Sequence, residues 1–273
     1  MKKSLLVLFG LSVLFIALKI FARSFFEVSL WRNQILNLLY LWSPGFVGLY
    51  FAKCEKLALP LFKNIRKGFF LIPLYAMAIA VVGILLSLAF GVSAELNPFI
   101  FGAEDTGMQQ MGKILILFFT AYFLPVIFMG ILLFGGEIFW RGYLWEKLKK
   151  TPPFKALWII TFFWLIWQLP LTYFAYTPGY SSVIFNLSFG SLIIAIVSPL
   201  LFYFRLKYRA VLASALFYAT LYSAFMWVGF LFHNALEPTN LNTYGSCVLG
   251  IALLLSLVLK LYSPKKWEQL RSK

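Results

Sequence analysis

Eight long apolar stretches dominate this sequence and leave it few ways to fold. Each approaches the roughly twenty residues that an α-helix needs to cross a bilayer. They lie at about 4–22, 34–52, 69–91, 114–136, 156–174, 182–204, 210–232 and 243–262. With 62% hydrophobic and 12% charged residues, the chain has the composition of an integral membrane protein, since soluble domains are about a quarter charged. We therefore predict an all-α fold, a polytopic transmembrane bundle of about eight helices, forming a single membrane domain over residues 1–273.

The distribution of charge predicts the orientation of this bundle. Most of the 24 basic residues fall on one side of the predicted spans, in 1–3, 53–68, the region after Gly142, 205–209 and the C-terminal tail. The opposite loops carry Glu27, Glu95, Glu104, Asp105 and Glu237. Because short cytoplasmic loops are enriched in Lys and Arg, we expect both termini in the cytoplasm. The membrane topology then accounts for the net charge of +15, and we expect no nucleic-acid partner.

The N-terminal region leaves one alternative open. Met1-Lys2-Lys3 followed by apolar residues has the form of a signal peptide, but no small-residue cleavage site precedes Arg23, so we expect an uncut first helix. The basic segment 54–69 carries leucines among its lysines. It either lies on an anionic membrane leaflet or forms a solvated loop that sets the topology.

One acid and one base stand at the end of the fourth apolar stretch. Glu137 and Arg141 are four residues apart, so on a helix they share one face and can form an ion pair. We expect this helix to continue to about Leu148, which places the pair at its cytoplasmic end. Ionisable residues at membrane depth are costly and indicate a functional site. The alternative is an ion pair that only ties helices together.

The sequence around this pair is Gly135-Gly136-Glu137-Ile138-Phe139-Trp140-Arg141-Gly142-Tyr143-Leu144. It resembles the first motif of the CPBP family, which comprises CAAX proteases and bacteriocin-processing enzymes, including the type II CAAX prenyl endopeptidases. The family motif is Glu-Glu-x-x-x-Arg, often framed as Gly-Glu-Glu-x-x-Trp-Arg-Gly-Tyr-Leu. In this register Glu137 matches the second family glutamate, and Gly136 replaces the first.

Two later segments resemble the remaining family motifs in order and in placement on helices. Residues 164–170 resemble a Trp-x-x-x-His-Leu-Pro element, with Gln168 at the histidine position. Residues 216–222 resemble the element that contains His-x-x-x-Asn, with Tyr218 for histidine and Tyr222 for asparagine. The family-like core extends over about residues 110–225.

The resemblance implies a fold in which the motif residues gather within the membrane, hold zinc and activate water for peptide hydrolysis. A catalytic zinc takes about three protein ligands from His, Asp, Glu or Cys. Here Gly136 has no side chain, and neither Gln168 nor Tyr218 is a usual ligand. The single histidine, His233, is expected at the opposite membrane surface. We therefore expect no cofactor. Zinc is expected only if unmatched positions supply ligands.

The interpretation we favour is a CPBP-like membrane protein that has lost zinc proteolysis and binds a transmembrane or lipid-modified peptide or protein. Glu137 and Arg141 remain as a structural pair, and Gln168, Tyr218 and Tyr222 fill the former site. Two alternatives stay open: an active intramembrane metalloendopeptidase of the CAAX or peptide-processing type, and a transporter of small molecules or lipids. In each case the lipid bilayer is a partner, as the bacterial inner membrane or the endoplasmic reticulum.

Overall fold

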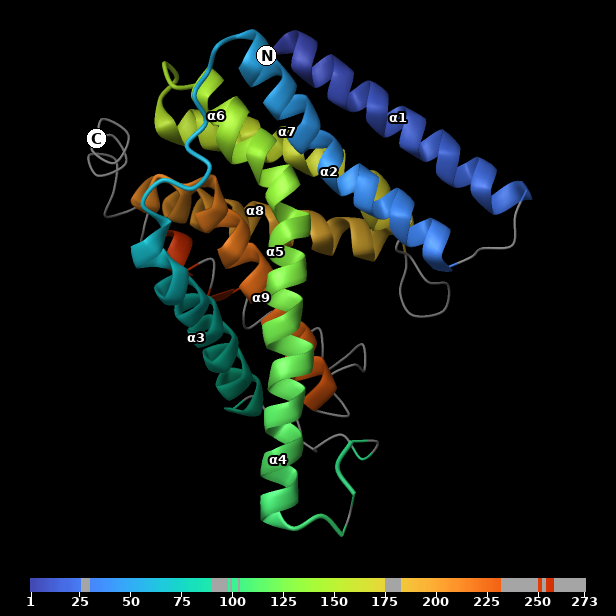
Figure 1. The fold of residues 1–273 in the computed structure, drawn as a ribbon, viewed down its shortest axis with the longest axis vertical. Coiled ribbons are helices and arrows are strands. Elements are labelled where there is room, and N and C mark those ends of the chain that lie inside the picture. The colour runs from blue at the N-terminus through green and yellow to red at the C-terminus, as the bar shows by residue number, and fades with distance from the viewer. Residues whose placement is uncertain are drawn as a thin grey trace.

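A computed structural model describes residues 1–25, 30–89, 98, 100–102, 104–174, 183–231, 250–251 and 254–257 (Figure 1). Its main helices are α1 (Lys2–Phe25), α2 (Leu30–Cys54), α3 (Gly68–Ala89), α4 (Gly107–Leu117), α5 (Leu124–Glu137), α6 (Leu144–Lys147), α7 (Pro153–Phe174), α8 (Val183–Tyr208) and α9 (Val211–Leu231). The short helices are η1 (Ile65–Lys67), η2 (Phe118–Phe123) and η3 (Ile138–Tyr143). No strand occurs among the described residues, so the all-α prediction is confirmed for them.

The helices have the length and surface of membrane-spanning elements. Four described stretches are long and apolar enough to cross a bilayer: Lys2–Phe21, Ile35–Cys54, Gly107–Lys147 and Ser191–Tyr208. Large apolar side chains such as Phe70 and Met108 are 76% and 87% exposed. Such a surface is unfavourable in water and normal in lipid. Most of the eighth predicted stretch lies outside the described residues. Its described part, residues 250–251 and 254–257, is helical.

One continuous helix, built from α4, η2, α5, η3 and α6, runs from Gly107 to Lys147. At about 1.5 Å per residue its 41 residues are roughly 60 Å long, about twice the hydrocarbon thickness of a bilayer. Its start is set by Thr106, whose side chain accepts from the Gln109 amide while the Gln109 side chain accepts from the Thr106 amide. The α4 end projects beyond α3 and α9 in Figure 1. The helix thus begins earlier than predicted and ends where predicted.

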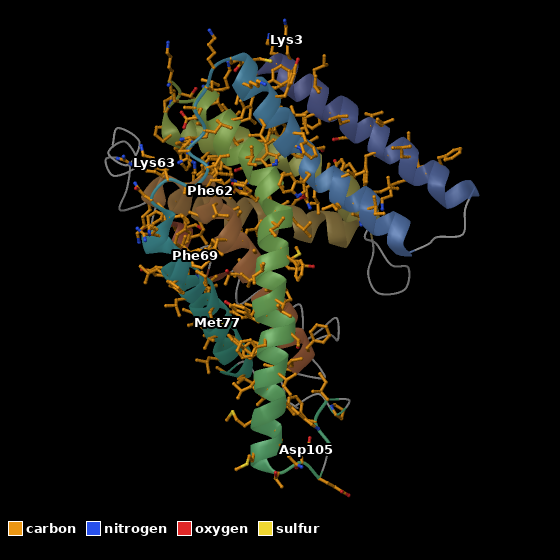
Figure 2. The ribbon with its side chains drawn as sticks, viewed as in Figure 1. Lys3, Phe62, Lys63, Phe69, Met77 and Asp105 are labelled. Carbon is orange, nitrogen blue, oxygen red and sulfur yellow. The ribbon has the colours of Figure 1, made fainter. Side chains whose placement is uncertain are left out.

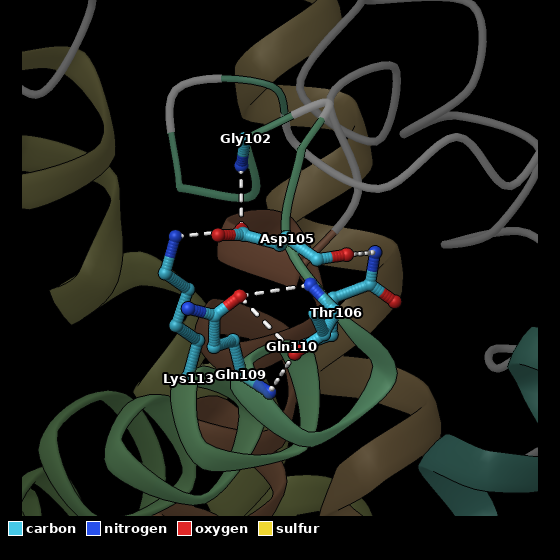
Figure 3. A network of polar contacts seen from close by, with 6 residues as sticks. All are labelled: Gly102, Asp105, Thr106, Gln109, Gln110 and Lys113. Carbon is cyan, nitrogen blue, oxygen red and sulfur yellow. Dashed lines mark hydrogen bonds and ion pairs between the residues drawn. The ribbon is translucent and has the colours of Figure 1, made fainter.

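A cluster of polar contacts fixes the chain ahead of this helix (Figure 3). The Asp105 carboxylate accepts a hydrogen bond from the Gly102 amide at 2.7 Å and forms an ion pair with Lys113 at 2.6 Å. The Gln110 side chain donates to the Asp105 carbonyl at 3.4 Å. These contacts tie the loop at Gly102 and Asp105 to the first two turns of the helix.

Helices α2 and α5 approach each other closely through glycines. A Cβ atom placed on Gly45 would lie 2.7 Å from the carbonyl oxygen of Gly135, and one placed on Gly135 would lie 2.8 Å from the Trp42 ring. Neither position has room for a side chain. Small residues allow such close backbone packing between helices in membranes. The contact positions the C-terminal end of α5, where Glu137 lies.

The basic segments meet at one end of the bundle. Lys147 forms an ion pair with Glu55 at 3.1 Å, and the Met1 amino group lies close enough to interact with both. Burial beside Lys147 holds the pKa of that amine below its usual range. Figure 2 shows Lys3 and Lys63 toward this end and Asp105 at the other. The described basic residues Lys3, Lys63 and Lys147 therefore lie toward one end of the bundle.

The basic segment 54–69 joins α2 to α3 through a loop and the short helix η1, and its loop lies against the start of α9. The amides of Val211 and Leu212 donate to the carbonyls of Pro60 and Leu61, each at 3.0 Å. Leu57 and Leu59 are half-buried and pack against the core, whereas Phe62 and the neighbouring lysines are exposed. The leucines of this loop thus point into the protein.

Candidate functional site

Glu137 and Arg141 form a buried ion pair. Glu137 is the last residue of α5 and Arg141 lies in η3, and a guanidinium nitrogen is 2.8 Å from carboxylate Oε1. Their side chains are 2% and 0% exposed. The predicted pairing on one helix face is confirmed. Glu137 and Arg141 precede the end of the long helix at Lys147, and both side chains are enclosed by the bundle rather than open at its surface.

The helix widens where it carries Arg141. Residues Ile138–Tyr143 form a π-helical turn, in which the amide of Leu144 donates to the carbonyl of Phe139 five residues earlier. Glycines at 135, 136 and 142 weaken the preference for a regular α-helix here. Such π-turns within α-helices occur frequently at functional sites. The sequence pattern does not predict this turn.

Arg141 connects its own helix to α7 and α8 by hydrogen bonds. Its second terminal nitrogen donates to the hydroxyl of Ser198 at 3.1 Å. Ser198 shares a hydrogen bond of 2.6 Å with Thr161, which in turn donates to the Leu157 carbonyl. All of these side chains are buried. The charge of Arg141 is therefore embedded in a polar chain that crosses three helices.

Aromatic rings cover the guanidinium of Arg141. Its central carbon lies 4.0 Å from the ring centre of Trp164 and 5.2 Å from that of Phe202. Arginine stacks well on aromatic faces, and the interaction strengthens when water is excluded. The Trp164 ring also packs edge-on against Tyr218, with ring centres 5.9 Å apart. Residues far apart in sequence thus enclose one cation.

Two atoms of the ion pair have no hydrogen-bond partner among the described residues: Glu137 Oε2 and Arg141 Nε. Ser214 of α9 lies beside the carboxylate, but its hydroxyl donates to the Val211 carbonyl at 2.7 Å. A second buried donor, the indole nitrogen of Trp140, is also unpaired within the described residues. Buried polar atoms normally find partners, so these atoms are candidates for contact with a ligand.

The structure places Tyr218 near the ion pair. Tyr218 is half-buried and its hydroxyl is close enough to interact electrostatically with both Glu137 and Arg141. Tyr222, one turn further along α9, is 45% exposed. Gln168 is half-buried on α7, one turn beyond Trp164. Tyr218 therefore belongs to the electrostatic surroundings of the ion pair.

Gly136 has room for a side chain, unlike its neighbour Gly135. The nearest atoms to a Cβ at position 136 are ring atoms of Trp140, at 3.8 and 3.9 Å, which is ordinary van der Waals distance. The farther of these two atoms is the unpaired indole nitrogen. The position at which the family resemblance expects a glutamate thus has room for a Cβ atom.

Several residues of the site were not singled out from the sequence: Thr161, Ser198, Phe202 and Ser214. Small polar residues at isolated positions on apolar helices were the only available signal. Lys19, another ionisable residue within a predicted span, is 4% exposed and lies 5.5 Å from the Phe15 ring centre, outside this site. His233 and Cys247 lie outside the described residues.

The side chains around Glu137 do not fit a zinc centre. Glu137 contributes one carboxylate, and its nearest charged partner is a guanidinium, which repels a divalent cation. The other polar neighbours are hydroxyls of Ser214 and Tyr218. Among the described residues no three of His, Cys, Asp and Glu cluster together. A tetrahedral zinc site with three protein ligands cannot be built from these donors.

Comparison of the chain with protein-family models and with curated proteins finds no match.

Proposed function

We propose that this chain is a CPBP-like integral membrane protein that has lost zinc-dependent proteolysis and acts by binding a transmembrane or lipid-modified partner. The proposal depends on one observation. The carboxylate at the first motif is held by Arg141 inside the bundle, and the surrounding donors do not fit zinc. Both termini and the basic loops lie on the cytoplasmic side in this proposal.

The retained motif residues support a structural function for the ion pair. Arg141 contacts Glu137 on its own helix, Ser198 and Phe202 on α8, and Trp164 on α7. It therefore fixes the relative positions of these helices. A structural function of this kind explains why Glu137 and Arg141 match the family motif although the positions required for metal chemistry are substituted.

The membrane setting supports a partner within the bilayer. The long helix presents exposed apolar side chains along most of its length, including Met111, Ile116, Phe119 and Phe128. A transmembrane or lipid-modified segment is matched to such a surface in chemistry and depth. Loss of proteolysis leaves this capacity to bind intact.

The test uses two full-length proteins reconstituted in lipid: the natural chain and a variant carrying Gly136→Glu, Gln168→His, Tyr218→His and Tyr222→Asn. Each is incubated with membrane-embedded and CAAX-like prenylated peptides, with and without a chelator. We expect no cleavage by the natural chain. Chelator-sensitive cleavage by the natural chain would overturn the proposal.

The four-residue variant tests the family-like arrangement of the site. We expect it to gain bound zinc, because Gly136 has room for a side chain and Tyr218 already lies beside Glu137. Adding Glu137→Gln to this variant is the matched control and should abolish the gain. A folded four-residue variant without zinc would contradict the assignment of these positions to one site.

A further inference from the structure

The end of α8 carries a lysine surrounded by tyrosines. The Lys207 ammonium lies 5.4 Å from the ring centre of Tyr75, 5.6 Å from that of Tyr203 and 5.5 Å from that of Tyr208. Tyr75 comes from the second turn of α3 and the other two from α8. Tyr75 of α3 and two tyrosines of α8 therefore place three aromatic rings around one exposed cation.

Among the described residues, this cation has aromatic neighbours and forms no ion pair with a carboxylate. The ion pairs of the described residues all involve other basic side chains, so no described carboxylate neutralises Lys207. Rings orient an ammonium group through cation–π attraction but leave its charge in place. The site thus presents a fixed positive charge that attracts an anion.

The hydroxyl of Tyr208, next to Lys207, is the second feature of this site. Tyr208 is only 6% exposed, and its hydroxyl has no hydrogen-bond partner among the described residues. Its ring edge lies against the start of α3, where a Cβ on Gly68 would be 2.9 Å away. The tyrosine next to Lys207 therefore holds an unused polar group at the same helix junction.

The surroundings favour a lipid over a free anion. Lys207 lies at the basic end of the bundle, and below Tyr75 the outer side of α3 exposes Leu74 and Leu85, which are 63% and 59% exposed. An ammonium with tyrosine hydroxyls above an apolar helix face matches a phosphate headgroup above acyl chains. Tyrosines favour this interfacial depth.

We infer that Lys207, Tyr75, Tyr203 and Tyr208 form a binding site for the phosphate headgroup of an anionic phospholipid, whose acyl chains lie along α3. The inference does not depend on the proposed function. Juxtamembrane basic residues each contribute about 1 kcal/mol to attraction for anionic lipid, equivalent to roughly a five-fold change in affinity.

The test measures retention of phosphatidylglycerol and phosphatidylcholine on the full chain in detergent by native mass spectrometry. We expect phosphatidylglycerol to bind in preference, and Lys207→Gln to weaken it about five-fold. Lys150→Gln is the matched control, since it removes an exposed lysine at the same end that lies outside the tyrosine cluster, and it should weaken binding clearly less than Lys207→Gln does. Lys207→Arg retains the charge and should retain binding, which separates loss of charge from loss of folding.

Three results would overturn the inference. Equal weakening by Lys207→Gln and Lys150→Gln would show only diffuse attraction to the basic end. Equal retention of phosphatidylcholine would show that the headgroup charge is not recognised. Displacement of phosphatidylglycerol by millimolar inorganic phosphate would assign the site to a free anion.

Discussion

The guanidinium of Arg141 lies 4.0 Å from the ring centre of Trp164 while one of its nitrogens is 2.8 Å from Glu137. A single side chain thus combines an ion pair within one helix with stacking between helices. Because both the charge and the ring are buried, replacing either changes the packing of the bundle as well as its electrostatics.

Arg141→Met is expected to lower the free energy of unfolding by about 3 kcal/mol or more, because it leaves the Glu137 carboxylate buried without its partner. The double variant Glu137→Leu with Arg141→Met removes both charges and should recover most of this loss. Equilibrium unfolding in mixed micelles measures the free energy of unfolding of the natural chain, of each single variant and of the double variant. Additive losses in the double variant would mean that the two side chains are not coupled.

Adjacent glycines offer a sharp comparison of packing. Gly135→Ala places a methyl group 2.8 Å from the Trp42 ring and should separate α2 from α5, at a cost of about 1–3 kcal/mol. Gly136→Ala meets only ordinary contacts, and Gly112→Ala meets none, so both should be neutral or slightly stabilising. Thermal unfolding of the three full-length variants in one detergent distinguishes them. Equal effects at 135 and 136 would contradict the close approach of the helices.

The start of the long helix is predicted to depend on its capping box. Thr106→Ala removes the acceptor for the Gln109 amide and should cost about 1 kcal/mol of local stability. Hydrogen exchange of residues 107–113 reports this directly, since the first turns open before the bundle unfolds. Thr120→Ala, where the hydroxyl bonds only within its own helix, is the control. Unchanged protection in Thr106→Ala would exclude the cap.

The hydrogen-exchange protection at the start of the long helix should also depend on pH. The hydrogen bond from Lys113 holds the pKa of Asp105 below its usual range, with the Gly102 amide acting in the same direction. Because the pKa of Asp105 is lowered in the folded state, the carboxylate contributes its full stabilisation above its unfolded-state pKa of about 3.9. This stabilisation is lost as the pH falls through the folded-state pKa. Protection factors of Asp105→Asn and the natural chain should therefore differ at neutral pH and converge in acid. A difference that persists in acid would contradict this contribution.

Cysteine labelling tests the proposed topology. Cys54 is exposed at the basic end, and Gly107, at the other end, has open space around an added side chain. In a Cys247→Ser background we expect a membrane-impermeant maleimide to label Cys54 only from the cytoplasmic side. In the same background with Cys54→Ser, Gly107→Cys should label only from the opposite side. Labelling of both positions from one side would contradict a membrane crossing between them.

The sequence predicts helices well here because their lengths and apolar content are set by the bilayer. The alternation of basic and acidic loops also predicts which helix ends lie together. The pairing of Glu137 with Arg141 follows from spacing alone, since both residues belong to one helix.

Contacts between helices are harder to predict. Ser198 and Thr161 meet Arg141 only because α7 and α8 pack with particular rotations, and helices that are apolar on all sides give no sign of which face is buried. The π-turn at Ile138–Tyr143 and the contact of Gly45 with Gly135 also arise from tertiary packing. The motif predicts Gly136, Gln168, Tyr218 and Tyr222 as the positions of one site, and Tyr218 lies near enough to the ion pair to interact with it electrostatically.

The zinc content of the purified natural chain tests the central claim most directly. The protein is extracted from membranes without chelator and analysed beside Glu137→Ala by elemental mass spectrometry. Since Arg141 pairs with the Glu137 carboxylate and no three potential ligands cluster among the described residues, we expect zinc far below one atom per chain in both proteins. One zinc per natural chain, lost in Glu137→Ala, would contradict the account.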